Sequence, residues 1–552
     1  MFVEHIIKIL NKCLSDLKQD DLSIEFEINK SLIEKPQKSI HGDYACTIAM
    51  KFAHKLNLKP MDFANRIVDK INNNDEIIDK SWVQPPGFIN FSIKNSVLIN
   101  QINNVIKLGK KFGDFTKVST EKIQIEFVSV NPTGPLHVGH ARGAVIGSTL
   151  ANVLESAGYI VEREYYINDD GRQIKLFNDS LFARFLELLG KENTFPLDGY
   201  VGSYVIDIAK QFITNNNQNS EVFNNSDIYT ILSEFGMNYI LGSIKEDMKH
   251  LKVNYDVWFS EKTLYETEDF NEAIDLLKAN GSLIESDGAI WFETENNDNN
   301  KVVIRSNGEP TYFASDIAYH YNKFIKRKFS RVIDIWGADH QGQIPFMKSM
   351  IEKFGIDRNN LNLLIYQLVT LKRDGEIVRI SKRTGDLITF KELLEDVGPD
   401  VCRFFFLTRS PESQMEFDID LAKKESEDNP VYYIQYAYAR ICSILRLADE
   451  KGIDYSNPNL NLISDDSELD MIRKMISLPD VILKISETLG PHHLPHYAME
   501  FANSFHLFYQ KCRVISDENL EITKARLRLV LSAKIVLAKY LTLMGLNKPE
   551  KM

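Results

Sequence analysis

The sequence is poor in cysteine and has no cysteine spacing typical of a metal site. Its five cysteines lie far apart, are odd in number and form no CxxC pair: Cys13, Cys46, Cys402, Cys442 and Cys512. This pattern argues against a disulfide framework and against a zinc cluster, so we expect no structural metal. Buried free thiols in a reducing compartment explain it better, and we expect a cytoplasmic protein.

Long apolar runs are also missing. No stretch of about 18 or more apolar residues occurs, so we expect no membrane span. The first residues, Met1 to His5, lack a charged region followed by an apolar one, so we expect no secretory signal.

Basic residues are outnumbered, with 65 Lys and Arg against 77 Asp and Glu, which gives a net charge of −12. Because phosphate contacts need Lys and Arg, this balance argues weakly against nucleic-acid binding. Net charge does not exclude a local patch, however, and the C-terminal stretch is locally basic. A solvated helix face is the simpler interpretation of these residues: Lys511, Arg513, Lys524, Arg526, Arg528, Lys534, Lys539, Lys548 and Lys551.

A length of 552 residues with 44% hydrophobic residues predicts about three globular domains. We expect a small α+β domain over residues 1–112, with helices over 2–17 and 61–71 and a strand over 88–93. We expect an α/β domain with a Rossmann-like parallel sheet over 113–425, and an all-α domain over 426–552 that opens with an amphipathic helix from Pro430.

Two predicted strands support the parallel sheet, the first with alternating apolar and polar residues and the second apolar throughout most of its length. The first, from Lys122, is followed by a loop with two prolines and a glycine and then by a helix from about Gly139, which is the opening of a nucleotide-binding βαβ unit. The second, over 332–336, ends in Gly337-Ala338-Asp339-His340. Roughly 140 residues of helices and polar loops separate them, too many for one crossover, so we predict an insertion at about 165–300.

The first motif is His137-Val138-Gly139-His140, at the predicted start of that helix. A helix N-terminus offers free N–H groups and positive dipole to a phosphate, and imidazoles donate hydrogen bonds as charge builds up. Gly139 leaves room for a base or ribose to approach the backbone. Metal ligation is a weaker interpretation, because no third ligand is obvious nearby, and so short a pattern also occurs by chance.

The second motif is Arg379-Ile380-Ser381-Lys382-Arg383-Thr384-Gly385. A cationic loop can hold the β- and γ-phosphates of a nucleotide while pyrophosphate leaves. Taken alone, these residues are better interpreted as a solvated loop.

Together the two motifs resemble class I aminoacyl-tRNA synthetases. The string from Asn131 to Gly143 is similar to the HIGH signature, and the second motif is similar to the KMSKS loop, with Arg379 and Ile380 in place of its first lysine and its methionine. Further strings resemble the arginyl-tRNA synthetase family and extend the resemblance over nearly the whole chain: residues 41–45, 256–261, 311–316, 430–437 and 549–552.

The resemblance implies roles for particular residues. The catalytic residues are His137, His140 and Lys382. The ATP-binding residues are Pro132, Gly134, His137, Gly139, His140, Gly337, Asp339, Ser381, Lys382 and Arg383. The arginine-binding residues are Glu126, Asn131, Glu261, Tyr312, Asp316 and Gln341. The tRNA-binding residues are Asn90, Tyr432 and Tyr436, where the tyrosines could instead be core residues.

The implied reaction is ATP- and Mg²⁺-dependent activation of L-arginine and its transfer to tRNA(Arg) by a monomer, with tRNA bound before arginine is activated. Three alternatives remain open. The chain could activate another amino acid, although the missing zinc cluster disfavours cysteine. It could be a non-catalytic tRNA-binding relative, which the intact motifs disfavour. It could be a small-molecule nucleotidyltransferase, which has no need of a long helical C-terminal domain.

Overall fold

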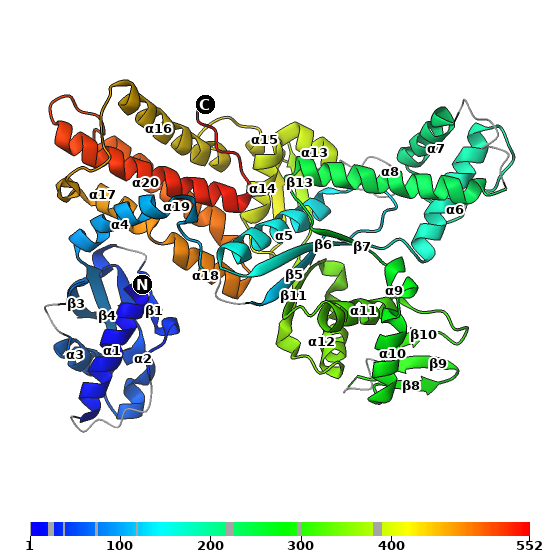
Figure 1. Cartoon of the computed structure of the whole chain (residues 1–552), viewed down its shortest axis with the longest axis horizontal. Coiled ribbons are helices and arrows are strands. Elements are labelled where there is room, and N and C mark those ends of the chain that lie inside the picture. Colours follow the sequence, from blue (N-terminus) through cyan, green and yellow to red (C-terminus); the bar gives the residue numbers. More distant parts are fainter. Residues whose placement is uncertain are drawn as a thin grey trace. The chain divides into compact units, whose positions relative to one another are not determined.

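A computed structural model describes residues 2–19, 27–36, 39–71, 75–116, 120–216, 226–294, 300–378 and 389–552. The chain forms two units (Figure 1). One comprises Met1–Phe112, Arg440–Ser477 and Asn503–Val536, and the other comprises Gly113–Ala439, Leu478–Ala502 and Leu537–Met552. No helix among the described residues is both long and apolar enough to cross a bilayer.

The first unit has a four-stranded antiparallel sheet in the order β1-β2-β4-β3. Its strands are β1 (Ile33–Glu34), β2 (Tyr44–Cys46), β3 (Ile78–Gln84) and β4 (Phe88–Ile93). Its helices include α1 (Phe2–Gln19), α2 (Ile48–Phe52), α3 (Pro60–Asp69), α4 (Asn95–Leu108) and α17 (Asp466–Met475). The two helices and the strand predicted for this part of the sequence are confirmed.

The second unit is built on a five-stranded parallel sheet in the order β12-β11-β5-β6-β7. The strands are β5 (Lys122–Phe127), β6 (Ile160–Ile167), β7 (Val257–Ser260), β11 (Arg331–Gly337) and β12 (Leu361–Tyr366). Five of the six residues of β5 are buried, as expected for a parallel sheet with helices on both faces. The predicted Rossmann-like sheet is therefore confirmed.

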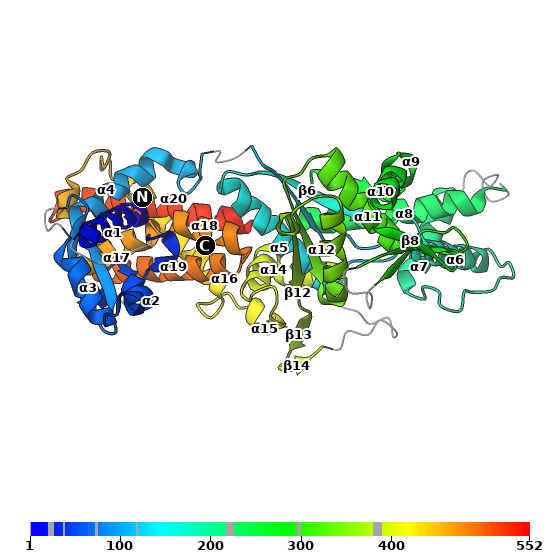
Figure 2. The same cartoon turned by 90° about the horizontal axis from the view of Figure 1, so that it is seen from below.

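Helices cover this sheet on both sides (Figures 1 and 2). One side carries α5 (Val138–Ser156), α13 (Phe390–Val397) and α14 (Pro399–Leu407), and the other carries α11 (Tyr312–Tyr321) and α12 (Ile344–Lys353). Two glycines let α5 approach its neighbours closely. A Cβ on Gly147 would lie 2.2 Å from Phe127 Cγ, and one on Gly143 would lie 2.9 Å from Tyr366 Cε1.

Extra elements fall into two groups around β7, which itself lies within the interval 165–300. Between β6 and β7 are α6 (Arg172–Leu188), α7 (Ser203–Asn215) and α8 (Ile228–His250). Between β7 and β11, before α11, are α9 (Lys262–Glu266), α10 (Asp269–Ala279) and an antiparallel sheet of β8 (Leu283–Ser286), β9 (Ala289–Phe292) and β10 (Lys301–Ile304).

The C-terminal part of the chain is helical, as predicted. After a small sheet of β13 (Val369–Arg373), β14 (Glu376–Ile377) and β15 (Met415–Asp418), a short α15 (Ile419–Ala422) leads into it. The long helices are α16 (Pro430–Glu450), α18 (Leu478–Thr488), α19 (His493–Lys511) and α20 (Leu520–Met544). Pro430 stands at the first position of α16, where its missing N–H costs no hydrogen bond.

Candidate active site

The predicted site residues follow the carboxyl ends of the parallel strands. The chain continues from β5 in the centre to β6 on one side and returns later to β11 on the other, so strand order reverses at β5. In open α/β sheets, ligands bind in the crevice at such a switch point. Glu126 lies near the end of β5, and His137 caps α5 after the loop that follows this strand. Glu261 follows β7 directly, and Asp339 follows β11. Parallel topology therefore places them along one edge.

The backbone just after β5 is strained. Val128 and Ser129 have φ angles of +73° and +43°, a region that non-glycine residues rarely occupy. Such conformations cost on the order of 1–3 kcal/mol each and cluster at functional sites. Ser129 Oγ accepts a hydrogen bond from the Tyr166 N–H at 3.0 Å, which ties this turn to β6.

The two histidines of the first motif cap the N-terminus of α5. The Gly139 N–H donates to His137 Nδ1 at 3.2 Å, and the His137 N–H donates to His140 Nδ1 at 3.3 Å. The rings stack with centroids 3.4 Å apart. Because each Nδ1 accepts a backbone N–H, the tautomer that fits these contacts carries its proton on Nε2. An Nε2–H at a helix N-terminus is a donor of the kind that a phosphate accepts.

The loop that precedes the motif is held by side chains of the elements between β6 and β7. Asn131 Nδ2 donates to Gln173 Oε1 of α6 at 2.5 Å, and the Tyr204 hydroxyl of α7 donates to the Thr133 carbonyl at 2.7 Å. Pro132 and Thr133 are buried, whereas Gly134 is half-buried. The predicted nucleotide loop is thus held by one side chain, that of Asn131, and by one backbone carbonyl, that of Thr133.

The second motif lies outside the described residues, which resume at Thr389. The positions concerned are Ser381, Lys382 and Arg383, together with Arg379. The residues that follow are joined to the first motif: Thr389 forms a β-bridge with His137, and the Phe390 N–H donates to the Leu136 carbonyl at 3.0 Å. The segment that carries Lys382 is therefore followed directly by residues beside His137.

Three carboxylates act on Tyr166: burial raises the pKa of its hydroxyl most, and the charges of Glu261, Asp316 and Glu126 add to that rise. Burial raises the pKa of Asp316 to about 7; His320 opposes this rise, and the charges of Glu126 and Glu261 add to it. Burial also raises the pKa of Glu261, whose carboxylate lies 2.8 Å from the Asn168 amide when that amide is oriented to donate. A bound cation would relieve this repulsion between carboxylates.

A buried ion-pair network, which the sequence did not reveal, supports this cluster. The Lys323 ammonium is fully buried and donates to Glu126 Oε2 at 2.6 Å and to Asp334 Oδ1 at 2.8 Å. His320 Nε2 lies 3.0 Å from Asp334 Oδ2. Burial raises the pKa of Glu126 against the attraction of Lys323, whereas Lys323 and His320 outweigh burial at Asp334 and hold its pKa at about 2.

The network has no clear signal in the sequence. Lys323 lies seven residues after Asp316, in a π-helical turn, Asn322–Lys326, that continues α11. The sequence of this segment does not mark Lys323 as buried, and its partner Glu126 is 197 residues away in the chain. The structure shows Glu126 already paired with a cation, which the sequence did not predict.

The other residues predicted to bind arginine or ATP are more exposed than the buried network around Lys323. Tyr312, at the start of α11, is 60% exposed, and Asp316 on the same helix is half-buried. Asp339 and Gln341 lie exposed on a short helix, Ala338–Gln343, directly after β11. A Cβ on Gly337 would lie 2.6 Å from Asp339 Oδ1, the end of an exposed side chain that could turn away.

The three residues predicted to contact tRNA differ in their surroundings. Tyr432 and Tyr436 are half-buried on α16, with nearly parallel rings whose centroids lie 6.4 Å apart. Asn90 on β4 is 1% exposed, and its amide donates to Gln84 Oε1 at 2.9 Å. In this structure Asn90 is therefore a residue of the domain interior.

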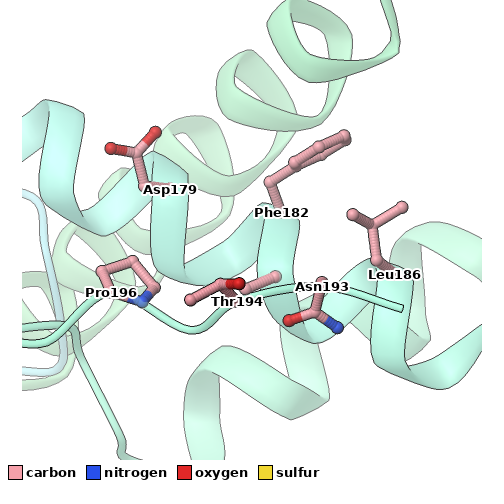
Figure 3. Close-up of a pocket in the computed structure, with 7 residues that line it drawn as sticks. Asp179, Phe182, Leu186, Asn193, Thr194 and Pro196 are labelled. Carbon is pink, nitrogen blue, oxygen red and sulfur yellow. The ribbon is translucent and has the colours of Figure 1, made fainter. Parts of the chain in front are cut away.

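An open pocket lies beside α6, apart from the predicted site (Figure 3). It is lined by Asp179, Phe182, Ala183, Leu186, Asn193, Thr194 and Pro196. None of these lining residues is basic, and the Asp179 carboxylate already accepts the Tyr229 hydroxyl at 2.7 Å. The pocket lacks the cations expected of a phosphate site.

Comparison with known proteins covers the whole chain. Family models match three consecutive parts: the arginyl tRNA synthetase N terminal domain over residues 4–93, the tRNA synthetases class I (R) catalytic domain over 101–401 and the DALR anticodon binding domain over 434–552. An arginine–tRNA ligase of Dehalococcoides mccartyi is 48% identical over 551 residues, which cover 99% of this chain and 98% of that one. One of Caldanaerobacter subterraneus is 42% identical over 556 residues, which cover 100% and 98%.

Among solved structures, the arginyl-tRNA synthetase of Thermus thermophilus has the same fold. It aligns over 100% of both chains with a TM-score of 0.78 at 22% identity. The catalytic-domain model matches more than half of the chain, and the relatives cover nearly all of it. The resemblance predicted from the motifs is confirmed, and the chain belongs to the arginyl-tRNA synthetase family.

Proposed function

We propose that this arginine–tRNA ligase uses the carboxylates around Tyr166 to bind arginine and the N-terminus of α5 to bind ATP. The observation that carries the proposal is the pairing of these two features along one edge of the sheet: Glu261 and Asp316 supply negative charge, and His137 and His140 supply donors. A guanidinium needs the first feature, and a triphosphate needs the second.

In the activation step the arginine carboxylate attacks the α-phosphorus of ATP. A carboxylate oxygen–phosphorus bond forms, the bond to the bridging oxygen breaks, and pyrophosphate leaves with the electron pair. His137 and His140 donate from Nε2 to the phosphate oxygens as charge develops there. Pro132, Gly134 and Gly139 shape the nucleotide loop, Gly337 and Asp339 bind the nucleoside from β11, and Ser381, Lys382 and Arg383 bind the pyrophosphate group.

Arginine is held at both ends. Glu261 and Asp316 accept hydrogen bonds from the guanidinium, and Tyr312 packs beside it. Glu126, Asn131 and Gln341 orient the α-amino and α-carboxylate groups. Neutralisation of the half-buried Asp316 by the substrate favours arginine over uncharged amino acids of the same length, since an uncharged ligand would leave the repulsion in place.

The arginyl group then passes to the 3′ end of tRNA(Arg). We propose that Tyr432 and Tyr436 stack on unpaired bases, which suits their parallel rings, and that Asn90 contributes from the N-terminal domain. The proposed domains are residues 1–112, 113–425 with the insertion at about 165–300, and 426–552. We further propose that ATP enters with Mg²⁺, and that the protein is a cytoplasmic monomer.

Arginine-dependent ATP–pyrophosphate exchange, with and without tRNA(Arg), tests this function. Exchange should require arginine and tRNA, and lysine, citrulline and cysteine should support none. Exchange driven equally by another amino acid would refute the arginine site. Exchange without tRNA would refute the proposed order of binding, and sedimentation at working concentration would reveal any dimer.

A further inference from the structure

The nucleotide loop is attached to a tyrosine of the segment between β6 and β7. The Tyr204 hydroxyl donates to the Thr133 carbonyl at 2.7 Å. A Cβ built on Gly134 would lie 3.1 Å from the same hydroxyl oxygen, so the tyrosine packs directly against the residue that the site needs small. Thr133 is buried and its N–H donates to the Asn131 carbonyl at 2.8 Å, so both of its backbone groups are engaged.

Two glycines lie close to other atoms in the segment that carries Tyr204, and one of them, Gly202, lies against the tyrosine ring. A Cβ on Gly202, which precedes α7, would lie 2.5 Å from Tyr204 Cε1. A Cβ on Gly199 would lie 2.6 Å from Phe195 Cε1 and 2.8 Å from Ser180 Oγ. Side chains at either glycine would therefore displace this segment. Burial raises the pKa of Tyr204, which keeps its hydroxyl protonated and able to donate.

The loop is held on its other flank as well. Leu136 and His137 pair with Phe390 and Thr389, which follow the second motif. Tyr204 thus fixes the middle of the loop from one side while the residues after the second motif fix its end from the other. A carbonyl held by a hydroxyl cannot rotate freely, so the orientation of the peptide between Thr133 and Gly134 depends on Tyr204.

We propose that Tyr204 is a positioning residue for ATP: its hydrogen bond to the Thr133 carbonyl sets the conformation of the loop from Asn131 to Pro135 that receives the nucleotide. The proposal rests on the ATP-binding role proposed above for this loop. Tyr204 acts through the loop and leaves the arginine carboxylates untouched, so its loss affects the two substrates unequally.

The test is Tyr204→Phe in the full-length protein with tRNA(Arg) present. The ring and its packing remain, and only the hydrogen bond is lost. The KM for ATP should rise about fivefold, equivalent to about 1 kcal/mol at 1.36 kcal/mol per tenfold, while the KM for arginine stays within twofold. A purely structural role would not separate the two substrates in this way.

Tyr229→Phe is the matched control. Its hydroxyl donates to Asp179 at the same 2.7 Å, from α8 to α6, away from the loop. It should leave both KM values unchanged and lower the melting temperature as much as Tyr204→Phe does. Equal changes in both KM values, an unchanged KM for ATP, or the same KM change in the control would overturn the proposal.

His140→Ala separates this proposal from the one on which it rests. If His140→Ala slows exchange and Tyr204→Phe leaves the KM for ATP unchanged, the loop binds ATP but Tyr204 does not position it, and the inference fails. If His140→Ala leaves exchange unchanged, the ATP-binding role of the motif fails, and the inference fails with it.

Discussion

The two halves of the proposed site hold their residues in different ways. On the phosphate side the structure uses backbone groups: the histidines cap α5 and a tyrosine binds the Thr133 carbonyl. On the arginine side it uses charged side chains, with Lys323 buried between Glu126 and Asp334.

The difference follows from the ligands. Phosphates can be bound by neutral N–H groups and a helix dipole, which need no counter-ion when the site is empty. A guanidinium requires carboxylates, and carboxylates that are buried without a ligand repel each other and pick up protons. The arginine side therefore needs an internal cation, and its substitutions should cost more stability than those on the phosphate side.

The largest expected effect is on stability. Lys323→Met leaves Glu126 and Asp334 buried without their cation, and should lower the free energy of unfolding by roughly 3–5 kcal/mol. Lys326→Met is the control, because its ammonium pairs with Glu272 at the surface and should contribute less than about 1 kcal/mol. Urea unfolding followed by circular dichroism measures both. If the two variants lose equal free energy of unfolding, the buried ion-pair network does not stabilise the fold more than a surface pair does.

The next effect is on arginine binding. Asp316→Asn removes the half-buried carboxylate that we propose faces the guanidinium, and should raise the KM for arginine at least about 100-fold, or about 2.7 kcal/mol. The KM for ATP should stay within about threefold. Asp275→Asn, at an exposed position of α10, should change neither. A parallel rise in both KM values would remove the distinction between the two sides.

On the phosphate side, His140→Ala should lower the rate of ATP–pyrophosphate exchange at least tenfold, about 1.4 kcal/mol, because one Nε2–H donor is lost. The loss should appear in kcat with little change in the KM for arginine. Steady-state exchange kinetics with saturating tRNA measure it, and an unchanged rate would exclude this histidine from the mechanism.

The smallest effect is a pH dependence confined to the arginine side. With a pKa of about 7, Asp316 is largely protonated at pH 6 and ionised at pH 8, so the KM for arginine should fall up to about tenfold between them. Asp316→Asn should remove the part of this pH dependence that comes from ionisation of Asp316. The KM for ATP should show no matching change, and a matching change would locate the titrating group elsewhere.

Without arginine, ionisation of Asp316 should lower the stability of the folded protein, although it improves arginine binding. Because burial raises the pKa of Asp316 on folding, from its ordinary value of 3.8 to about 7, the folded state binds more protons between these values. The Asp316 contribution to stability therefore falls as pH rises through this window. Melting temperatures at pH 5 and pH 8, with Asp316→Asn as the reference, measure this contribution. If the Asp316 contribution to stability instead rises with pH, the raised pKa of Asp316 is contradicted.

Residues next to recognisable strand and helix signals could be placed from the sequence. The apolar strand, the proline-glycine loop and the helix start predict the setting of His137 and His140, and β11 predicts that of Asp339. Parallel topology then brings them to one edge without further information. The family resemblance supplied Glu261 and Asp316, which composition and periodicity alone would have left as ordinary polar residues.

Partners that are distant in the chain could not be found in this way. Lys323 and Tyr204 act on residues 197 and 71 positions away, and neither contact follows from helical or strand periodicity. The burial of Asn90 depends on how β4 pairs with its neighbours, which a single strand pattern does not specify.

The most direct test is a structure of the protein with a non-hydrolysable ATP analogue and arginine. The account predicts the triphosphate within hydrogen-bonding distance of Nε2 of His137 and His140, with Lys382 on the same phosphates and the guanidinium between Glu261 and Asp316. A triphosphate bound away from both histidines, or a guanidinium that contacts neither carboxylate, would contradict it.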